Sequence, residues 1–225
     1  MIRLGVLASG GGTNLQALLD ACAARRIDAE VALVLSNLPG AGALERAARA
    51  GVAGDCLPSK GVTDRAAYDQ ALLARLREAR VDLVCLAGYM RLVTPAFLRA
   101  FGPSPSSRGC PRVVNIHPAL LPSFPGLHAQ RQALAAGVKV TGCTVHFVDE
   151  GTDTGPIVVQ AAVPVLDGDT EATLAARILE QEHRLYPQAI QWIAEGRLSL
   201  QGRQVRLDRA TPPAERLRSP AVELA

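Results

Sequence analysis

Residues 2–14 read Ile-Arg-Leu-Gly-Val-Leu-Ala-Ser-Gly-Gly-Gly-Thr-Asn. The apolar run over residues 2–8 is typical of a buried β-strand, and the glycines after it predict a tight turn that opens a helix from about Asn14 to Arg26. Free backbone N–H groups at the start of such a helix form an anion site, most naturally for a phosphate. A turn that needs glycine only for close packing is the alternative. No lysine stands where a Walker motif requires one, which argues against nucleotide triphosphate hydrolysis.

The alternation of apolar strand and helix continues along the chain. Strands are predicted at residues 31–35 and 82–87, and helices at residues 43–50 and 66–79. Because these strands are continuous apolar runs, they indicate a parallel sheet that is covered on both faces. The predicted fold class is therefore α/β, with an open, mostly parallel twisted sheet and helices on both faces. In such sheets ligands bind at the carboxyl ends of the strands.

The second half of the chain is expected to extend this sheet. Predicted elements are short strands at 113–115, 143–148 and 157–165, a long helix at 170–195, and a small hairpin that joins 198–200 to 204–207. Pro, Ser and Gly predict an exposed loop over 102–111 and an irregular loop over 118–128. We expect residues 1–207 to form one domain and residues 208–225 to form a disordered tail, since the end of the chain is Pro-rich and charged.

Composition excludes several classes of protein. The chain has 225 residues, 48% of them hydrophobic, and a net charge of +3, with no basic block, so we expect a full core and no nucleic-acid partner. The apolar N-terminal run is too short to span a bilayer and lacks a signal-peptide layout, which predicts a cytoplasmic protein without membrane attachment. Five cysteines without C-x-x-C spacing predict reduced thiols, and no His and Cys pair has metal-ligand spacing, so no metal is expected.

Two polar motifs, Asn115-Ile116-His117-Pro118 and Asp153-Thr154-Gly155-Pro156, suggest catalysis. Asn115 and His117 are two residues apart, so at a strand end both side chains can face the same side. An Asn donor can stabilise an oxyanion, a His can transfer protons near neutral pH, and a carboxylate can orient that His. Together they indicate acyl or formyl transfer to an amine, or hydrolysis of a related bond. The alternatives are a polar strand end that caps a turn and an Asp that is only a turn residue.

Several separated segments carry a resemblance to a known family. They are residues 9–17 (SGGGTNLQA), 86–91 (LAGYMR), 115–122 (NIHPALLP), 142–148 (GCTVHFV), 153–157 (DTGPI) and 181–183 (QEH). In this order they resemble phosphoribosylglycinamide formyltransferase, the folate-dependent enzyme of purine synthesis, over roughly residues 1–207. The resemblance implies direct transfer of the formyl group of 10-formyltetrahydrofolate, a co-substrate, to the amine of glycinamide ribonucleotide through a tetrahedral intermediate. It also implies two small-molecule partners and a monomer or homodimer.

The family's functional residues can be carried over to this sequence. The resemblance implies that the N-terminal half binds the ribonucleotide, and that the C-terminal half binds folate and carries out catalysis. His146 can be a core histidine bonded to a backbone carbonyl, or a supporting residue of the site. The implied residues are Asn115, His117 and Asp153 for catalysis, Gly11, Gly12, Thr13, Asn14 and Glu182 for the phosphate and ribose, and Met90, Arg91, Leu92, Val93, Phe97, Val148 and Asp153 for the folate.

One segment departs from the family, and related activities compete. The stretch 101–112 is longer than the usual connection, and we expect a surface loop that rearranges the folate-side rim. Formyltetrahydrofolate deformylase, which passes the formyl group to water, is the main alternative, although it usually carries an extra N-terminal domain. Methionyl-tRNA formyltransferase would need a C-terminal RNA-binding domain. Loss of Asn, His or Asp would favour a non-catalytic phosphate-binding protein. The second strand ends at Ser36-Asn37, without the acidic residue of a nicotinamide site.

Overall fold

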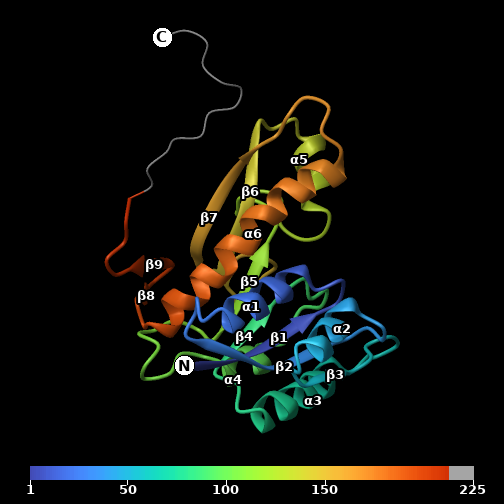
Figure 1. Cartoon of the computed structure of the whole chain (residues 1–225), viewed down its shortest axis with the longest axis vertical. Helices are drawn as coiled ribbons and strands as arrows, with labels where there is room; N and C mark the ends of the chain where they lie inside the picture. The colour runs from blue at the N-terminus through green and yellow to red at the C-terminus, as the bar shows by residue number, and fades with distance from the viewer. Residues whose placement is uncertain (213–225) are drawn as a thin grey trace.

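The computed structural model describes residues 1–212, and residues 213–225, most of the predicted tail, lie outside the described residues. A seven-stranded sheet has the order β3-β2-β1-β4-β5-β6-β7, and a separate hairpin, β8-β9, lies next to β7 (Figure 1). The strands are β1 (Ile2–Ala8), β2 (Ala29–Ser36), β3 (Gly54–Cys56), β4 (Leu83–Leu86), β5 (Val113–His117), β6 (Val140–Phe147), β7 (Ile157–Pro164), β8 (Leu198–Gln201) and β9 (Gln204–Leu207). The helices are α1 (Thr13–Ala23), α2 (Gly42–Arg49), α3 (Arg65–Glu78), α4 (Pro95–Ala100), α5 (Ala129–Ala135) and α6 (Glu171–Ala194).

The sheet is parallel from β3 through β2, β1 and β4 to β5, and β6 and β7 then pair antiparallel. The predicted open, mostly parallel α/β sheet is therefore confirmed. The strand order reverses between β1 and β4, because the chain first adds strands on one side of β1 and then returns to its other side. Ligands of open α/β sheets bind at such a switch point, outside the carboxyl ends of the strands.

Helices cover both faces of the sheet, as predicted. One core cluster packs α1, α2, α5 and α6 against one face, and a second cluster packs α3 and α4 against the other. Val6 belongs to the first cluster and Leu7 to the second, since successive side chains of a strand point to opposite faces. The fully buried Tyr186 donates its hydroxyl to the Leu86 carbonyl at 2.9 Å, which anchors the long α6 helix to β4.

Three short elements, β3, α4 and α5, were not predicted. β3 has three residues and no apolar run, so its sequence carries no strand period. α4 does carry helix-start signals: the Thr94 hydroxyl accepts the Phe97 N–H at 3.3 Å, and Pro95 occupies the first turn. α1 ends at Ala23, whereas the predicted helix runs to Arg26. Element type was therefore easier to predict than the short elements and the boundaries.

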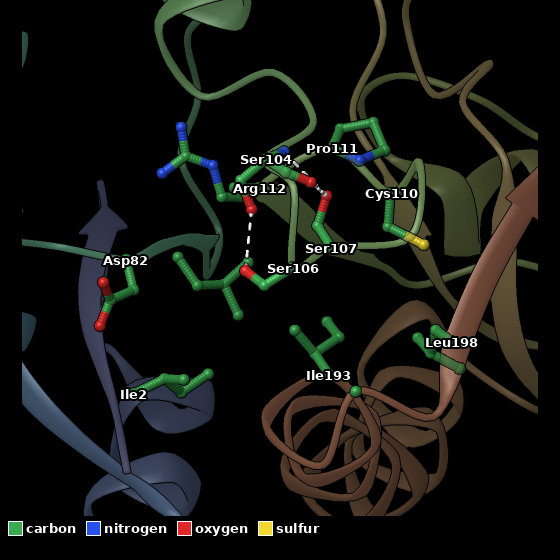
Figure 2. A pocket seen from close by; sticks show the side chains of 12 residues that line it. Ile2, Asp82, Ser104, Ser106, Ser107, Cys110, Pro111, Arg112, Ile193 and Leu198 are labelled. Carbon is green, nitrogen blue, oxygen red and sulfur yellow. Dashed lines mark hydrogen bonds between the residues drawn. The ribbon is translucent and has the colours of Figure 1, made fainter.

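The long loop before β5 was expected at the carboxyl ends of the strands, where the folate side lies, but it lies at their amino ends. It leads into the amino end of β5, so it lies away from the carboxyl ends of the parallel strands. Arg108 of this loop pairs with Asp208, and its carbonyl accepts the Leu200 N–H at 3.2 Å, which braces the hairpin. Figure 2 shows Cys110 of the loop and Ile193 of α6 around a cavity of about 390 Å³. The prediction that this loop rearranges the folate-side rim is wrong.

Candidate active site

The Asn-x-His motif forms the carboxyl end of β5. Asn115 and His117 are two residues apart within the strand, so their side chains project from the same face. Val114 and Ile116 point the other way, into the first core cluster, and hold the strand in place. The motif therefore presents an amide and an imidazole together at the edge of the sheet where ligands are expected.

The Asp153 carboxylate reaches this pair from the turn between β6 and β7. Its Oδ2 atom lies 3.3 Å from Nδ1 of His117 and accepts the Gly126 N–H at 2.7 Å. Its Oδ1 atom lies 3.4 Å from Nδ2 of Asn115. The structure thus brings the three predicted catalytic side chains together, although Asp153 is far from the other two in the sequence.

Neighbouring residues determine the conformation of the turn that carries Asp153. Asp153 has a φ of 55°, a conformation that residues other than glycine seldom adopt. A Cβ atom on Gly155 would lie 1.7 Å from the Phe147 carbonyl oxygen, so only glycine fits there. The Asp149 carboxylate accepts the Thr154 hydroxyl at 2.6 Å and closes the turn on itself. The carboxylate of Asp153 is therefore aimed by packing and hydrogen bonds around it.

Both ring nitrogens of the buried His117 face hydrogen-bond acceptors. Nε2 lies 2.8 Å from the Phe124 carbonyl oxygen, and Nδ1 faces Asp153. Burial lowers the pKa of His117 below its usual 6.5. The Phe124 carbonyl and the Asp153 carboxylate raise this pKa, but by less than burial lowers it. An imidazolium would donate to both acceptors, whereas either neutral tautomer turns one lone pair toward an oxygen. Burial therefore favours the neutral ring, whereas the two acceptors favour the protonated ring. This balance suits a group that takes up a proton as negative charge develops beside it.

Asp153 is ionised at neutral pH. Burial by itself raises the pKa of this carboxyl, but contact with His146, the Gly126 N–H and the nearby His117 lower it more, so the net pKa lies below 3.8. A permanent negative charge next to His117 stabilises the imidazolium whenever it forms. The pair can therefore exchange a proton with a bound substrate.

His146 lies on β6 directly opposite Asn115. Its Nδ1 atom lies 2.9 Å from the Phe147 carbonyl oxygen, to which it donates, and its Nε2 atom lies 3.1 Å from the Asn115 amide nitrogen and 3.6 Å from Oδ1 of Asp153. This geometry combines the two interpretations of His146, a backbone-bonded core histidine and a residue next to the site. It also orients Asn115, whose second amide hydrogen points toward Asp153 over a long 3.4 Å contact that a ligand oxygen can replace.

The glycine-rich turn leads directly into α1, and no side chain of residues 1–212 caps that helix. Gly12 occupies the N-cap position with a φ of 74°, and a Cβ atom there would lie 2.7 Å from the Cα atom of Ala43. A Cβ atom on Gly11 would meet nothing within 4 Å. Packing therefore explains Gly12, while the uncapped N–H groups of the first turn, at Thr13 and Asn14, remain open to an anion.

Two long-range contacts support this turn from behind. Nε of Arg46 donates to the Gly11 carbonyl at 2.7 Å, a contact that no local sequence signal predicts. The buried Glu182 of α6 accepts the Asn14 amide at 2.7 Å, so the predicted ribose residue does meet the phosphate turn. Burial raises the pKa of Glu182, and the Asn14 amide partly opposes this. A buried carboxylate with a single amide partner has remaining acceptor capacity for a ligand hydroxyl.

The segment after β4, which the sequence predicts to bind folate, presents apolar side chains to solvent. Met90 is 61% exposed and Leu92 is 56% exposed. Between them, the guanidinium of Arg91 lies over the ring of Tyr68, 4.4 Å from its centroid. This stacking holds Arg91 against the protein, while its two apolar neighbours stay exposed to solvent.

The other residues assigned to the folate pocket are more buried. Val93 and Val148 are partly buried and pack against the second core cluster. Phe97 is completely buried, and its ring centroid lies 5.7 Å from that of Phe101. Phe97 therefore supports the segment from behind and has no exposed surface with which to line a pocket.

Comparison with known proteins shows the family to which the chain belongs. A family model described as formyl transferase matches residues 2–190. The chain belongs to the formyl transferase family. The phosphoribosylglycinamide formyltransferase of Escherichia coli (strain K12) is 44% identical over 203 residues, which are 90% of this chain and 92% of that protein. The crystal structure of glycinamide ribonucleotide transformylase 1 from Symbiobacterium toebii is 58% identical in sequence and superposes with a TM-score of 0.87. The match covers 92% of this chain and 94% of that chain.

Some relatives of this formyl transferase are much longer. The trifunctional purine biosynthetic protein adenosine-3 of Drosophila melanogaster is 51% identical over 196 residues, which are 86% of this chain but 14% of that protein. The chain therefore spans a small part of the fly protein and nearly all of the bacterial one. The family resemblance predicted from the sequence motifs is confirmed.

Sequence reasoning missed what the loop 118–128 contributes to this formyl transferase. Its Phe124 carbonyl and Gly126 N–H contact the imidazole and the carboxylate of the site. The buried Thr144 fastens the loop: its hydroxyl donates to the Ala119 carbonyl at 2.6 Å and accepts the Leu121 N–H at 3.1 Å. Backbone groups occur at every residue, so a motif search cannot single them out. The glycine at position 126 was the sequence feature that could have pointed to a close backbone contact in this loop.

Within residues 1–212 of this formyl transferase, no group of three or more His, Cys, Asp or Glu side chains is arranged to hold a metal ion. The five cysteines are free thiols. In the same part of the chain, no helix combines the length and the apolar character that crossing a membrane requires.

Proposed function

We propose that this formyl transferase passes the formyl group of 10-formyltetrahydrofolate to the amine of glycinamide ribonucleotide, in purine biosynthesis. The products are formylglycinamide ribonucleotide and tetrahydrofolate. The observation that supports this most strongly is the convergence on Asp153, which lies within 3.4 Å of both Asn115 and His117. Similarity to the E. coli phosphoribosylglycinamide formyltransferase over 92% of that protein supports the choice of acceptor.

The proposed chemistry is a direct transfer. The amine nitrogen attacks the formyl carbon, a C–N bond forms, and the formyl oxygen becomes an oxyanion. The Asn115 amide is one donor for this oxyanion, and the His117 imidazolium is the other once the oxyanion takes the place of the Phe124 carbonyl at Nε2. Groups of this kind contribute roughly 3 kcal/mol each. The intermediate collapses when the bond from the formyl carbon to N10 of the folate breaks. The amine loses one proton and N10 gains one, and Asp153 with His117 can relay it, directly or through water.

The two substrates would approach from neighbouring strands. The ribonucleotide phosphate would bind the free N–H groups at the start of α1, with Glu182 on the ribose, and the folate would lie on the segment of Met90 and Leu92. Both segments follow parallel strands at the switch point, so both substrates would meet at the end of β5. We propose that residues 1–207 form the catalytic domain. We also propose a cytoplasmic location, since the free cysteines fit a reducing compartment.

The direct test is to mix the purified protein with a 10-formyl folate analogue and follow folate release with and without glycinamide ribonucleotide. Release only with the ribonucleotide, together with formylated product, is the expected result. Release without the ribonucleotide would identify a deformylase instead. No release under either condition would overturn both activities and leave a binding protein.

A further inference from the structure

The hydroxyl of Ser9 connects the loops that follow three neighbouring strands. Ser9 is the last residue before the glycine turn and is only 7% exposed. Its Oγ atom accepts the Met90 N–H at 2.8 Å and donates to Oδ1 of Asn37 at 2.5 Å. Asn37 in turn donates its amide to the hydroxyl of Ser59 at 3.0 Å. One buried hydroxyl thus joins the loops after β1, β2 and β4 at the switch point.

The hydrogen bond between Ser9 and Met90 joins two segments that are proposed to bind different substrates. Ser9 continues directly into residues 10–14, the segment proposed to bind the ribonucleotide phosphate. Met90 begins residues 90–93, the segment proposed to bind the folate. The backbone repeats the connection, because the Ser9 N–H donates to the Gly88 carbonyl at 3.0 Å. Residue 9 therefore connects the two substrate segments through a side-chain hydrogen bond and a neighbouring backbone hydrogen bond.

We propose that Ser9 is a positioning residue that couples the two substrate segments, so that binding of one substrate favours binding of the other. The inference rests on the proposed function. Binding of a phosphate to residues 10–14 orders that turn, and through Ser9 it also orders the Met90 backbone on which the folate lies. The second substrate then pays less of the ordering cost, which is a coupling between sites.

A merely structural serine makes a different prediction. Buried hydroxyls are normally hydrogen-bonded, so removing one costs stability wherever it is. Ser36 is a matched control, since it is 1% exposed and its hydroxyl bonds only to the backbone of Leu38 in its own turn, at 3.1 Å. Ser36→Ala removes a buried hydroxyl close to the same edge of the sheet without touching the connection between the substrate segments.

The experiment is a set of calorimetric titrations of the full chain. Glycinamide ribonucleotide and a folate analogue with carbon in place of N10, which cannot transfer a formyl group, are each titrated alone and with the other at saturation. In the wild type and in Ser36→Ala, each ligand should tighten binding of the other by roughly 5-fold or more. In Ser9→Ala, which keeps only the backbone bond to Gly88, the factor should fall to about half or less of the wild-type value, while the affinities measured alone stay within about 3-fold. Ser9→Thr, which keeps the hydroxyl, should restore the coupling.

Each other outcome bears on the proposal. Full coupling in Ser9→Ala overturns it, and so does an equal loss of both affinities with the coupling intact, the result expected of a structural role. Absence of coupling in the wild type also overturns it. If Ser9→Ala does not fold, Ser9→Cys, with a weaker donor and acceptor, takes its place under the same criteria. A wild-type protein that binds neither ligand instead refutes the proposed function.

Discussion

Nδ1 of His117 lies 3.3 Å from Oδ2 of Asp153, and the same carboxylate oxygen accepts the Gly126 N–H at 2.7 Å. The backbone of one loop therefore aims the carboxylate that faces the imidazole. The turn that carries Asp153 and the loop that carries Gly126 must both be in position for this contact to form. The electrostatics of the pair thus depend on two segments that contain no other predicted catalytic side chain.

Asp153→Asn should lower the pKa of His117 further below 6.5, because the carboxylate that opposes the effect of burial is lost. Turnover should fall roughly a hundred- to ten-thousand-fold. Nitrogen chemical shifts of the ring across a pH titration report the pKa, and single-turnover assays report the rate. Asp167→Asn is the control, since Asp167 is an exposed residue that pairs with Lys139. An unchanged His117 pKa, or wild-type turnover, would contradict the assigned role of Asp153.

Glu182→Gln should make the protein more stable and a poorer binder of the ribonucleotide. The pKa of Glu182 is raised by burial, so its favourable contribution is complete below the unfolded value of 4.5 and is lost as the pH rises through the folded value. Gln keeps the acceptor for Asn14 without the charge. The melting temperature of the variant should therefore exceed that of the wild type at pH 8, and the difference should shrink toward pH 4.5. The exposed Glu180→Gln should show neither trend.

The two glycines of the phosphate turn should respond differently to substitution. Gly12→Ala should destabilise the fold by about 2 kcal/mol or more, because it combines a positive φ with a clash against Ala43. Gly11→Asp has room for its side chain and should leave the melting temperature nearly unchanged, yet raise the KM for the ribonucleotide, since a carboxylate repels the phosphate. Thermal unfolding and steady-state kinetics separate the two effects. An unchanged KM in Gly11→Asp would count against the phosphate role.

Arg108→Ala should lower the melting temperature slightly and leave the kinetic constants for both substrates unchanged. Arg108 pairs with Asp208 on the surface, an interaction worth about 0–1 kcal/mol, or at most a few degrees in melting temperature. Its loop lies at the amino ends of the strands, away from the site. Calorimetric melting and a full kinetic analysis of both substrates test this. A changed KM for the folate would restore the earlier expectation that the loop shapes the folate side.

Much of the fold followed from local patterns in the chain. Continuous apolar strands that alternate with helices identified a mostly parallel, doubly covered sheet, because burial on both faces requires such strands. The glycine turn and the Asn-x-His motif identified the two edges of the site, since each depends on residues that are adjacent in sequence. The elements that escaped prediction were short ones such as β3, which has three residues and therefore no period to detect.

Contacts between distant residues required the tertiary structure. The meeting of Asp153 with His117, the support of Gly11 by Arg46, and the connection of Ser9 to Met90 depend on strand order and register, which no local pattern encodes. Motifs therefore identified which groups could do the chemistry. The packed sheet decided where they meet, which of them are buried, and which backbone groups join them, because only the packed fold brings together groups that lie far apart along the chain.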